Sequence, residues 1–337
     1  MLIYILRRIG LAGLMLCGLV CLTFVITNIA PSDPAALAAG PDAGRSQIEQ
    51  VRRDYGLDKP LPEQFLRYVV DLAHGNLGRS IATGRPVRDD LALYFPATLE
   101  LCVVAMTIGM IFGVGFGVLS ALHKDGPVDH VTRIFAVSGL ALPPFWFGLL
   151  LQLAIAGWLG WLPTAGRLSV TTEVPDPITG LLLVDGLLRG NGHMIAEAAT
   201  YLALPALVLS FPCLAQILRV NRSEMVETLR ADYIVAARAH GVSPWRILAV
   251  HTLKNAMLPT LAIIGLRWGW MMSSTVLVET VFDFPGIGLY AVSSAVAGDF
   301  KPVMGVTLIV GLNFMIANLL IDILYGVLDP RLRSARA

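Results

Sequence analysis

The sequence predicts an all-helical membrane protein with six transmembrane helices and a small helical insertion on the outer side of the membrane. Composition and hydropathy support this fold class. Apolar residues make up 55% of the 337-residue chain, charged residues only 15%, and the mean hydropathy is +0.69. Soluble domains usually contain roughly 45–50% apolar residues. The third observation is a set of six apolar runs, each long enough for the roughly 20 helical residues that cross a bilayer.

Five of these runs contain no Asp, Glu, Lys or Arg. They cover residues 9–32, 101–123, 134–166, 198–218 and 302–321. The sixth run, residues 255–278, is interrupted only by Arg267. Core helices of soluble proteins show apolar runs of about 10–14 residues, so the longer runs argue against a soluble protein. The first run also exceeds the roughly 7–15 apolar residues of a signal peptide, which predicts an uncleaved anchor.

The distribution of basic residues predicts that both termini lie in the cytoplasm. With the N-terminus inside, the cytoplasmic segments carry 13 Lys and Arg residues and the short outer segments carry 3. Basic residues near the ends of spans remain on the cytoplasmic side, and long loops do not count in this comparison. We therefore expect an N-terminal transmembrane helix over residues 1–30, an extracytoplasmic helical loop over 31–95, and a core of five transmembrane helices over 96–337.

Two short amphipathic helices are expected in the first outer loop. The stretch SQIEQVRRDYGL has Ser46 and, three positions later, Glu49, which is a capping-box pattern, and Gly56 would end this helix. A second helix is expected in PLPEQFLRYVVDLAHG. In the second outer loop, ITGLLLVDGLLRG predicts a short segment parallel to the membrane.

The cytoplasmic segment between the fourth and fifth spans, about residues 219–259, is predicted to be structured. RSEMVETLRADYIVAARAH contains no Gly or Pro and favours a helix that continues from the fourth span or restarts after it. Gly241 would end this helix in a left-handed conformation. Ser243 and Pro244 predict the cap and first turn of a further helix that runs to Pro259. We expect a helix, a glycine turn and a second helix in the cytoplasm.

This segment could be a solvated hairpin, a basic surface held against anionic lipid, or a docking site for another protein. Small residues precede the glycine at Ala236, Ala237 and Ala239, and Tyr233 lies beside them. Small side chains let a partner approach closely, which favours docking into a protein groove.

Several blocks of the sequence carry a resemblance to a known family. VAARAHG, followed after seventeen residues by Pro259 in NAMLP, resembles the Glu-Ala-Ala loop of ABC-importer permeases, with Val235 at the family's Glu position. The other blocks are similar, in the same order, to the dipeptide, oligopeptide and nickel permease subfamily, in particular the subunit with the long first outer loop. They are YILRRIG, IAPSDPA, GLDKPLPEQFLRY, GNLGRSIATGRPV, FPATLEL, VETVFDFPGIG and NLLIDILYGVLDPRLR.

The resemblance implies the type I ABC importer permease fold in a bacterial inner membrane, with short peptides as cargo. Nickel chelates, glutathione and other small solutes are alternative cargoes on the same scaffold. The implied partners are a second homologous permease, two ATP-binding subunits and an extracytoplasmic substrate-binding protein. ATP and Mg²⁺ would be bound by the partner subunits, and this chain would bind no cofactor. The implied ATPase-coupling residues are Tyr233, Ala236, Ala237, Ala239, Gly241 and Pro259.

The residues themselves give little support to an enzyme. No Lys follows a Gly, as a P-loop requires, and neither a His-Glu-x-x-His nor a Gly-x-Ser-x-Gly pattern occurs. The net charge of +1 and the lack of a clustered basic face argue against nucleic-acid binding. The four cysteines show no Cys-x-x-Cys spacing, so a zinc site is not indicated.

Three charged residues in or near the spans are candidates for the translocation path. Arg267 and Asp322 could form a buried ion pair or line a polar passage, and Glu279 lies near an outer end. A secondary transporter or channel is a further alternative, although such proteins usually contain inverted repeats and none is evident here. Proline pairs in the third and fourth spans, Pro143–Pro144 and Pro205 with Pro212, predict kinks.

Overall fold

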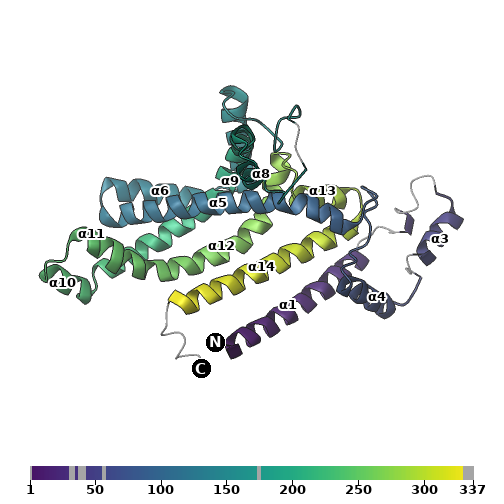
Figure 1. The fold of residues 1–337 in the computed structure, drawn as a ribbon, viewed down its shortest axis with the longest axis horizontal. Coiled ribbons are helices and arrows are strands. Elements are labelled where there is room, and N and C mark those ends of the chain that lie inside the picture. The colour runs from purple at the N-terminus through teal and green to yellow at the C-terminus, as the bar shows by residue number, and fades with distance from the viewer. Residues whose placement is uncertain (1, 30–34, 37–42, 55–57, 173–175, 329–337) are drawn as a thin grey trace. The chain divides into compact units, whose positions relative to one another are not determined.

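The computed structural model describes residues 2–29, 35–36, 43–54, 58–172 and 176–328, and each of the elements named below is a helix (Figure 1). A helix satisfies its backbone hydrogen bonds internally, as a chain that crosses hydrocarbon requires. The chain divides into two compact units, residues 1–98 with 285–315 and residues 99–284 with 316–337.

In the first unit, the helix α4 (Leu61–Ala73) packs on the N-terminal helix α1 (Leu2–Ile29). The Phe24 ring on the N-terminal helix contacts the rings of Phe65 and Tyr68, with centroids 5.2 and 6.0 Å apart. A separate core forms around Val87 and Tyr290. The other helices of this unit are α3 (Arg45–Asp54), the start of α5 (Val87–Leu122), α13 (Ile287–Val296) and the start of α14 (Phe300–Leu328).

The second unit is built around its longest helix, α9 (Gly192–Leu229), which is contacted by α6, α7, α8 and α12. Most of the apolar side chains of α9 are buried, so it is the central helix of this unit. The other elements are the rest of α5, α6 (Pro127–Ala141), α7 (Pro144–Leu151), the π-helix η1 (Gln152–Trp158), α8 (Leu182–Leu188), α10 (Asp232–Ala239), α11 (Pro244–Arg246), the π-helix η2 (Ile247–Leu253), α12 (Lys254–Val281) and the end of α14.

The helices account for the six apolar runs of the sequence. Among the described residues, four helical stretches are long and apolar enough to cross a membrane: α5, α9, the continuous stretch Pro244–Val281, and Phe300–Ile321. The bent pair of α6 with α7 and η1 would be a fifth. The first run lies in α1, a helix of 28 residues whose described side chains form the apolar stretch Gly10–Val25.

The third run is not one straight helix, which corrects the expectation of a single span over residues 134–166. The helix breaks after Ala141, and the two parts are bent by 108°. Leu142 is extended, with φ −79° and ψ 126°, because a following proline disfavours the helical conformation. The predicted kink is therefore a break at Pro143–Pro144, whereas Pro205 and Pro212 lie inside the continuous α9.

The sequence predicts that the helix after the glycine turn ends at Pro259, but in the structure this helix continues past Pro259. The chain is helical without interruption from Pro244 to Val281, and Pro259 lies inside α12. A proline removes one helical hydrogen bond. In a spanning helix this single loss costs less than leaving a whole helix end unbonded in hydrocarbon, so the helix continues.

The outer helices appear where the sequence predicts them, but one begins differently. Gly44, not Ser46, precedes α3: the Gln47 and Ile48 N–H groups donate to the Gly44 carbonyl, and the Gly44 N–H donates to Gln47 Oε1 at 2.9 Å. Ser46 is thus inside the helix, and Gln47 performs the capping role expected of Glu49. The predicted stop at Gly56 lies outside the described residues. The other two expected helices are present as α4 and α8.

Candidate functional site

The predicted cytoplasmic helix–turn–helix is present between α9 and α12. We call residues 230–243 the α10 segment. The helix α9 ends at Leu229, a short turn follows at Arg230 and Ala231, and α10 begins at Asp232. Figure 1 shows α10 and α11 together at one end of the second unit, away from α8. The α10 segment is therefore a compact protrusion and not an extended linker.

A Schellman motif closes α10. The Val242 N–H donates to the Ala237 carbonyl at 3.1 Å and the Gly241 N–H donates to the Arg238 carbonyl at 3.0 Å. Gly241 has a φ of +74°, as predicted. A Cβ built on Gly241 would meet nothing within 4 Å. Glycine is therefore required here by the backbone conformation and not by lack of space.

One side of α10 is exposed to solvent in the part of the chain that the structure describes. Tyr233 is 48% exposed and Val235 57% exposed. Of the predicted small residues, Ala236 and Ala239 are exposed and Ala237 is half-buried. The structure thus brings the predicted Tyr and Ala residues onto one short helix that a partner can reach, with Gly241 in the turn after this helix and Pro259 in α12.

The opposite side of α10 is fixed. Ile234 is fully buried, and the Asn255 side-chain amide donates to the Tyr233 hydroxyl at 3.0 Å and to the His251 carbonyl at 2.8 Å. These contacts hold α10 against η2 and the start of α12. Ser243 occupies the predicted cap position before Pro244, but its side chain makes no capping hydrogen bond.

A buried ion pair lies close to the base of the α10 segment. Asp129, the third residue of α6, is fully buried. Its Oδ1 accepts hydrogen bonds from Arg222 Nε and Ser120 Oγ, each at 2.6 Å. Its Oδ2 accepts from Arg222 Nη2 at 2.6 Å and from the Asp125 N–H at 2.9 Å. Three helices, α5, α6 and α9, therefore meet at one carboxylate.

The same end of α9 also contacts α12. The buried Asn221 amide donates to Thr260 Oγ1 at 3.3 Å. Sequence reasoning missed both this contact and the Asp129–Arg222 ion pair, because the partners lie 39 and 93 residues apart along the chain. The helix α5 also packs closely on α9, with Gly109, Gly113 and Gly117 facing it. A local signal did exist for this contact, because these three glycines recur every fourth residue, a spacing that favours close helix packing in membranes.

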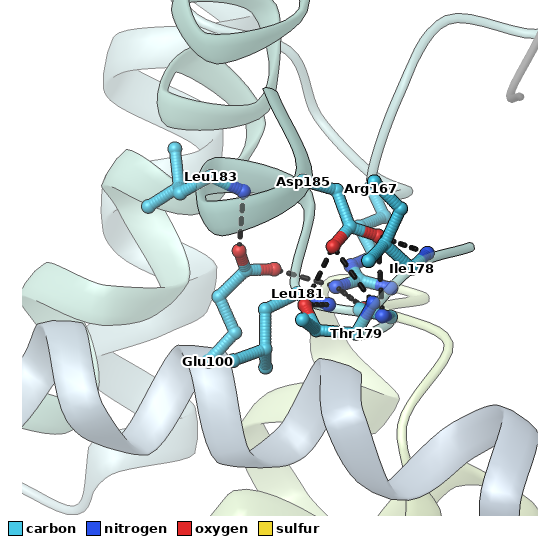
Figure 2. Close-up of polar contacts among 8 residues, drawn as sticks. Glu100, Arg167, Ile178, Thr179, Leu181, Leu183 and Asp185 are labelled. Atoms are coloured by element: carbon cyan, nitrogen blue, oxygen red, sulfur yellow. Dashed lines mark hydrogen bonds and ion pairs between the residues drawn. The ribbon is translucent and has the colours of Figure 1, made fainter. Parts of the chain in front are cut away.

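The other end of α9 carries a folded segment that the sequence predicts to lie on the outer side of the membrane, here called the outer segment (Figure 2). Glu100 on α5 is almost fully buried, and its carboxylate accepts from Arg167 Nη2 at 2.5 Å and from the Leu183 N–H at 2.7 Å. The same guanidinium donates to the Gly180 carbonyl at 2.8 Å. Glu100 thus satisfies one of the free N–H groups in the first turn of α8. These contacts fold the outer segment onto α5.

Asp185 closes the turn that leads into α8. Burial alone would raise the pKa of Asp185, but hydrogen bonds from the Thr179 hydroxyl and from the N–H groups of Ile178, Thr179 and Gly180 hold this pKa below its usual value. Figure 2 shows the carboxylate facing this turn. The carboxylate therefore stays charged at neutral pH and orders the turn.

Of the three residues predicted to line the translocation path, the structure describes the side chains of Arg267 and Glu279. Arg267 is partly exposed on α12, and its Cζ atom lies 5.4 Å from the centroid of the Trp270 ring, within the range of a cation–π contact. Glu279 is fully buried near the end of α12. The side chain of Asp322 lies outside the described part of the chain. Its pairing with Arg267 stays a prediction. Within the described residues, no three His, Cys, Asp or Glu side chains are placed to hold a metal ion.

Comparison with known families shows to which family the chain belongs. Residues 113–334 match the family described as binding-protein-dependent transport system inner membrane component, and residues 1–102 match the N-terminal domain of such membrane components. The chain belongs to this permease family. Its fold is therefore that of a type I importer permease, and the chain is a multi-pass inner-membrane protein, as the resemblance implied.

Full-length relatives support the assignment to ABC-importer permeases. This permease is 43% identical to the probable D,D-dipeptide transport system permease protein DdpB of Escherichia coli (strain K12) over 95% of this chain and 94% of the relative. It is 39% identical to the di/tripeptide transport system permease protein DppB of Pseudomonas aeruginosa over the full length of both chains. The glutathione transport system permease protein GsiC of Pectobacterium atrosepticum is 35% identical over 98% of each.

Proposed function

We propose that this permease imports short peptides, using ATP that is hydrolysed by partner subunits. The observation that carries the cargo assignment is the end-to-end match with permeases named for D,D-dipeptides and for di- and tripeptides. Glutathione is a tripeptide derivative, so the more distant glutathione relative supports a cargo of similar size.

The α10 segment is the surface that receives the ATPase. It combines an exposed, small-residue face with a fixed mount formed by Ile234 and the Asn255–Tyr233 hydrogen bond. A rigid helix in a partner's groove can transmit a displacement, whereas a loose loop would absorb it. In this proposal Tyr233, Ala236, Ala237, Ala239 and Gly241 form or shape the coupling face, and Pro259 lies in the helix that supports it.

The complete transporter would contain a second homologous permease, two ATP-binding subunits that hold ATP and Mg²⁺, and an extracytoplasmic substrate-binding protein. In this proposal the α10 segment lies on the cytoplasmic side, and both termini would then lie in the cytoplasm. ATP binding would close the ATPase pair, displace the α10 segment and open the permease pair outward to receive peptide. This chain would hold no cofactor.

Two measurements test this proposal. Deletion of the chain should abolish uptake of a labelled dipeptide by intact cells, and uptake should return when the chain is supplied on a plasmid. The ligand that copurifies with the binding protein encoded beside this chain should be a short peptide. A nickel chelate or glutathione in that protein would replace the cargo assignment and leave the transport mechanism intact.

A further inference from the structure

Asp129 is a fully buried carboxylate in the second unit that accepts four hydrogen bonds, yet none of the contacts described so far explains why a charge is present there. Its four hydrogen-bond donors come from three separate elements: Ser120 on α5, Asp125 in the following turn, and the forked guanidinium of Arg222 on α9. Arg222 binds both carboxylate oxygens. A bidentate pair of this kind fixes orientation as well as distance.

The position of Arg222 along α9 is informative. It lies seven residues before the end of α9 at Leu229, where the α10 segment begins. The residue before it, Asn221, is bonded to Thr260 on α12, and α12 carries the other end of the α10 segment through η2. Both flanks of the α10 segment are thus joined beneath it.

An apolar cluster fills the space between these flanks. Ala121 on α5, Met225 on α9 and Ala256 on α12 are buried against one another, with Leu248 and Leu253 of η2 packed on them. A close-packed cluster of this kind deforms little, so a displacement of the α10 segment is passed to α9 and α12 together. The Asp129–Arg222 ion pair is a polar contact that joins α9 to α6.

We propose that Asp129 and Arg222 are positioning residues that transmit the movement of the α10 segment to α5 and α6. This inference rests on the proposed function, in which the α10 segment receives the ATPase. When the segment moves, Arg222 carries Asp129 with it, and Ser120 extends the contact to the end of α5. Loss of the pair leaves the ATPase contact intact but disconnects it from two spanning helices.

The test is the number of peptides imported per ATP hydrolysed by the complete transporter, reconstituted in lipid vesicles with its binding protein. The substitution Asp129→Asn removes the charge of the carboxylate and keeps the size of the side chain. We expect ATP hydrolysis stimulated by the loaded binding protein to persist, and peptides imported per ATP to fall by about tenfold. Ser120→Ala removes a single hydrogen bond and should lower the ratio by about threefold. If the Asp129→Asn complex does not assemble, Ser120→Ala provides the test instead.

A matched control is available on the outer side of the same unit. Glu100 is also buried and also pairs with an arginine, Arg167. Glu100→Gln should lower the thermal stability of the complex but leave its peptides per ATP at the wild-type value. The inference is overturned if Asp129→Asn and Ser120→Ala lose uptake and hydrolysis in equal proportion, or if Glu100→Gln uncouples the complex as they do. Absence of ATP-driven peptide uptake in the wild-type complex would instead contradict the proposed function itself.

Discussion

Gly241 shows how one residue sets the shape of the α10 segment. Its positive φ directs the chain from α10 into α11, and the two hydrogen bonds of the Schellman motif hold that turn. A side chain at this position would meet no neighbouring atom, but the positive φ is unfavourable for most residues other than glycine. The sequence predicted this turn because a glycine stop is a local signal, carried by the residue that adopts the conformation.

Gly241→Val therefore tests the backbone conformation of this turn, because the new side chain meets no neighbouring atom. The left-handed region costs a non-glycine residue roughly 1–2 kcal/mol, and a β-branched side chain adds to this. We expect the protein to insert normally, while peptide uptake and substrate-stimulated ATP hydrolysis fall together. Gly241→Asn is the matched control, because Asn tolerates this conformation, and it should retain most of both activities. Normal transport by Gly241→Val would mean that the α10 segment is a passive linker.

The partner of the Arg267 guanidinium within its span can be tested by substitution. An unpaired arginine at a helix centre costs about 2.5–3.5 kcal/mol on insertion scales, so it needs a partner or water. If the partner is Asp322, Arg267→Leu alone should lower the melting temperature of the complex, and adding Asp322→Leu should recover much of the loss. Additive effects of the two changes on stability would rule out the ion pair and favour a position in the passage.

At the scale of elements, the α5–α9 contact depends on three glycines. Gly109, Gly113 and Gly117 face Cys213, Ile217 and Asn221, each set spaced by four residues. A Cβ at Gly113 would lie 2.8 Å from the Cβ of Ile217. The two helices thus approach as closely as their backbones allow, a common arrangement where lipid offers no hydrophobic drive to association.

Alanine substitutions on α5 test this packing. Gly113→Ala forces α5 and α9 apart and should lower the melting temperature of the solubilised complex. Gly115→Ala lies on the open side of the same helix, with nothing within 4 Å of its Cβ, and should leave stability unchanged or raise it, since Ala favours a helix over Gly by about 1 kcal/mol. Equal effects of the two substitutions would show that the α5–α9 contact is not close in the membrane.

The elements also show where sequence reasoning reaches its limit. Apolar runs predicted the helices well, because the bilayer imposes a length and composition that each run carries by itself. Proline could not be interpreted in the same way: Pro143–Pro144 breaks a span, whereas Pro205, Pro212 and Pro259 lie inside continuous helices. Helix bends and the contacts of Asp129 and Glu100 depend on residues far along the chain, and no local pattern specifies them.

For the whole molecule, the orientation rests on the excess of basic residues in the segments assigned to the cytoplasm. A reporter that is active only in the cytoplasm should be active when fused after Lys124 or at the C-terminus, and silent when fused near Gly75. The physical reason is that basic residues near span ends are retained on the cytoplasmic side. Activity of the fusion near Gly75 would reverse the orientation and remove the α10 segment from the side where ATP is hydrolysed.

In the proposed mechanism, this permease imports short peptides with energy from ATPases that act on the α10 segment. The most direct measurement is accumulation of a labelled dipeptide in vesicles that contain the complete transporter, with ATP on the side of the ATPase subunits and the binding protein on the other. We expect accumulation that requires ATP, the ATPase subunits and the binding protein, and that is lost in Gly241→Val. Accumulation by the permease pair without the ATPase subunits would contradict this mechanism and indicate a secondary transporter or channel.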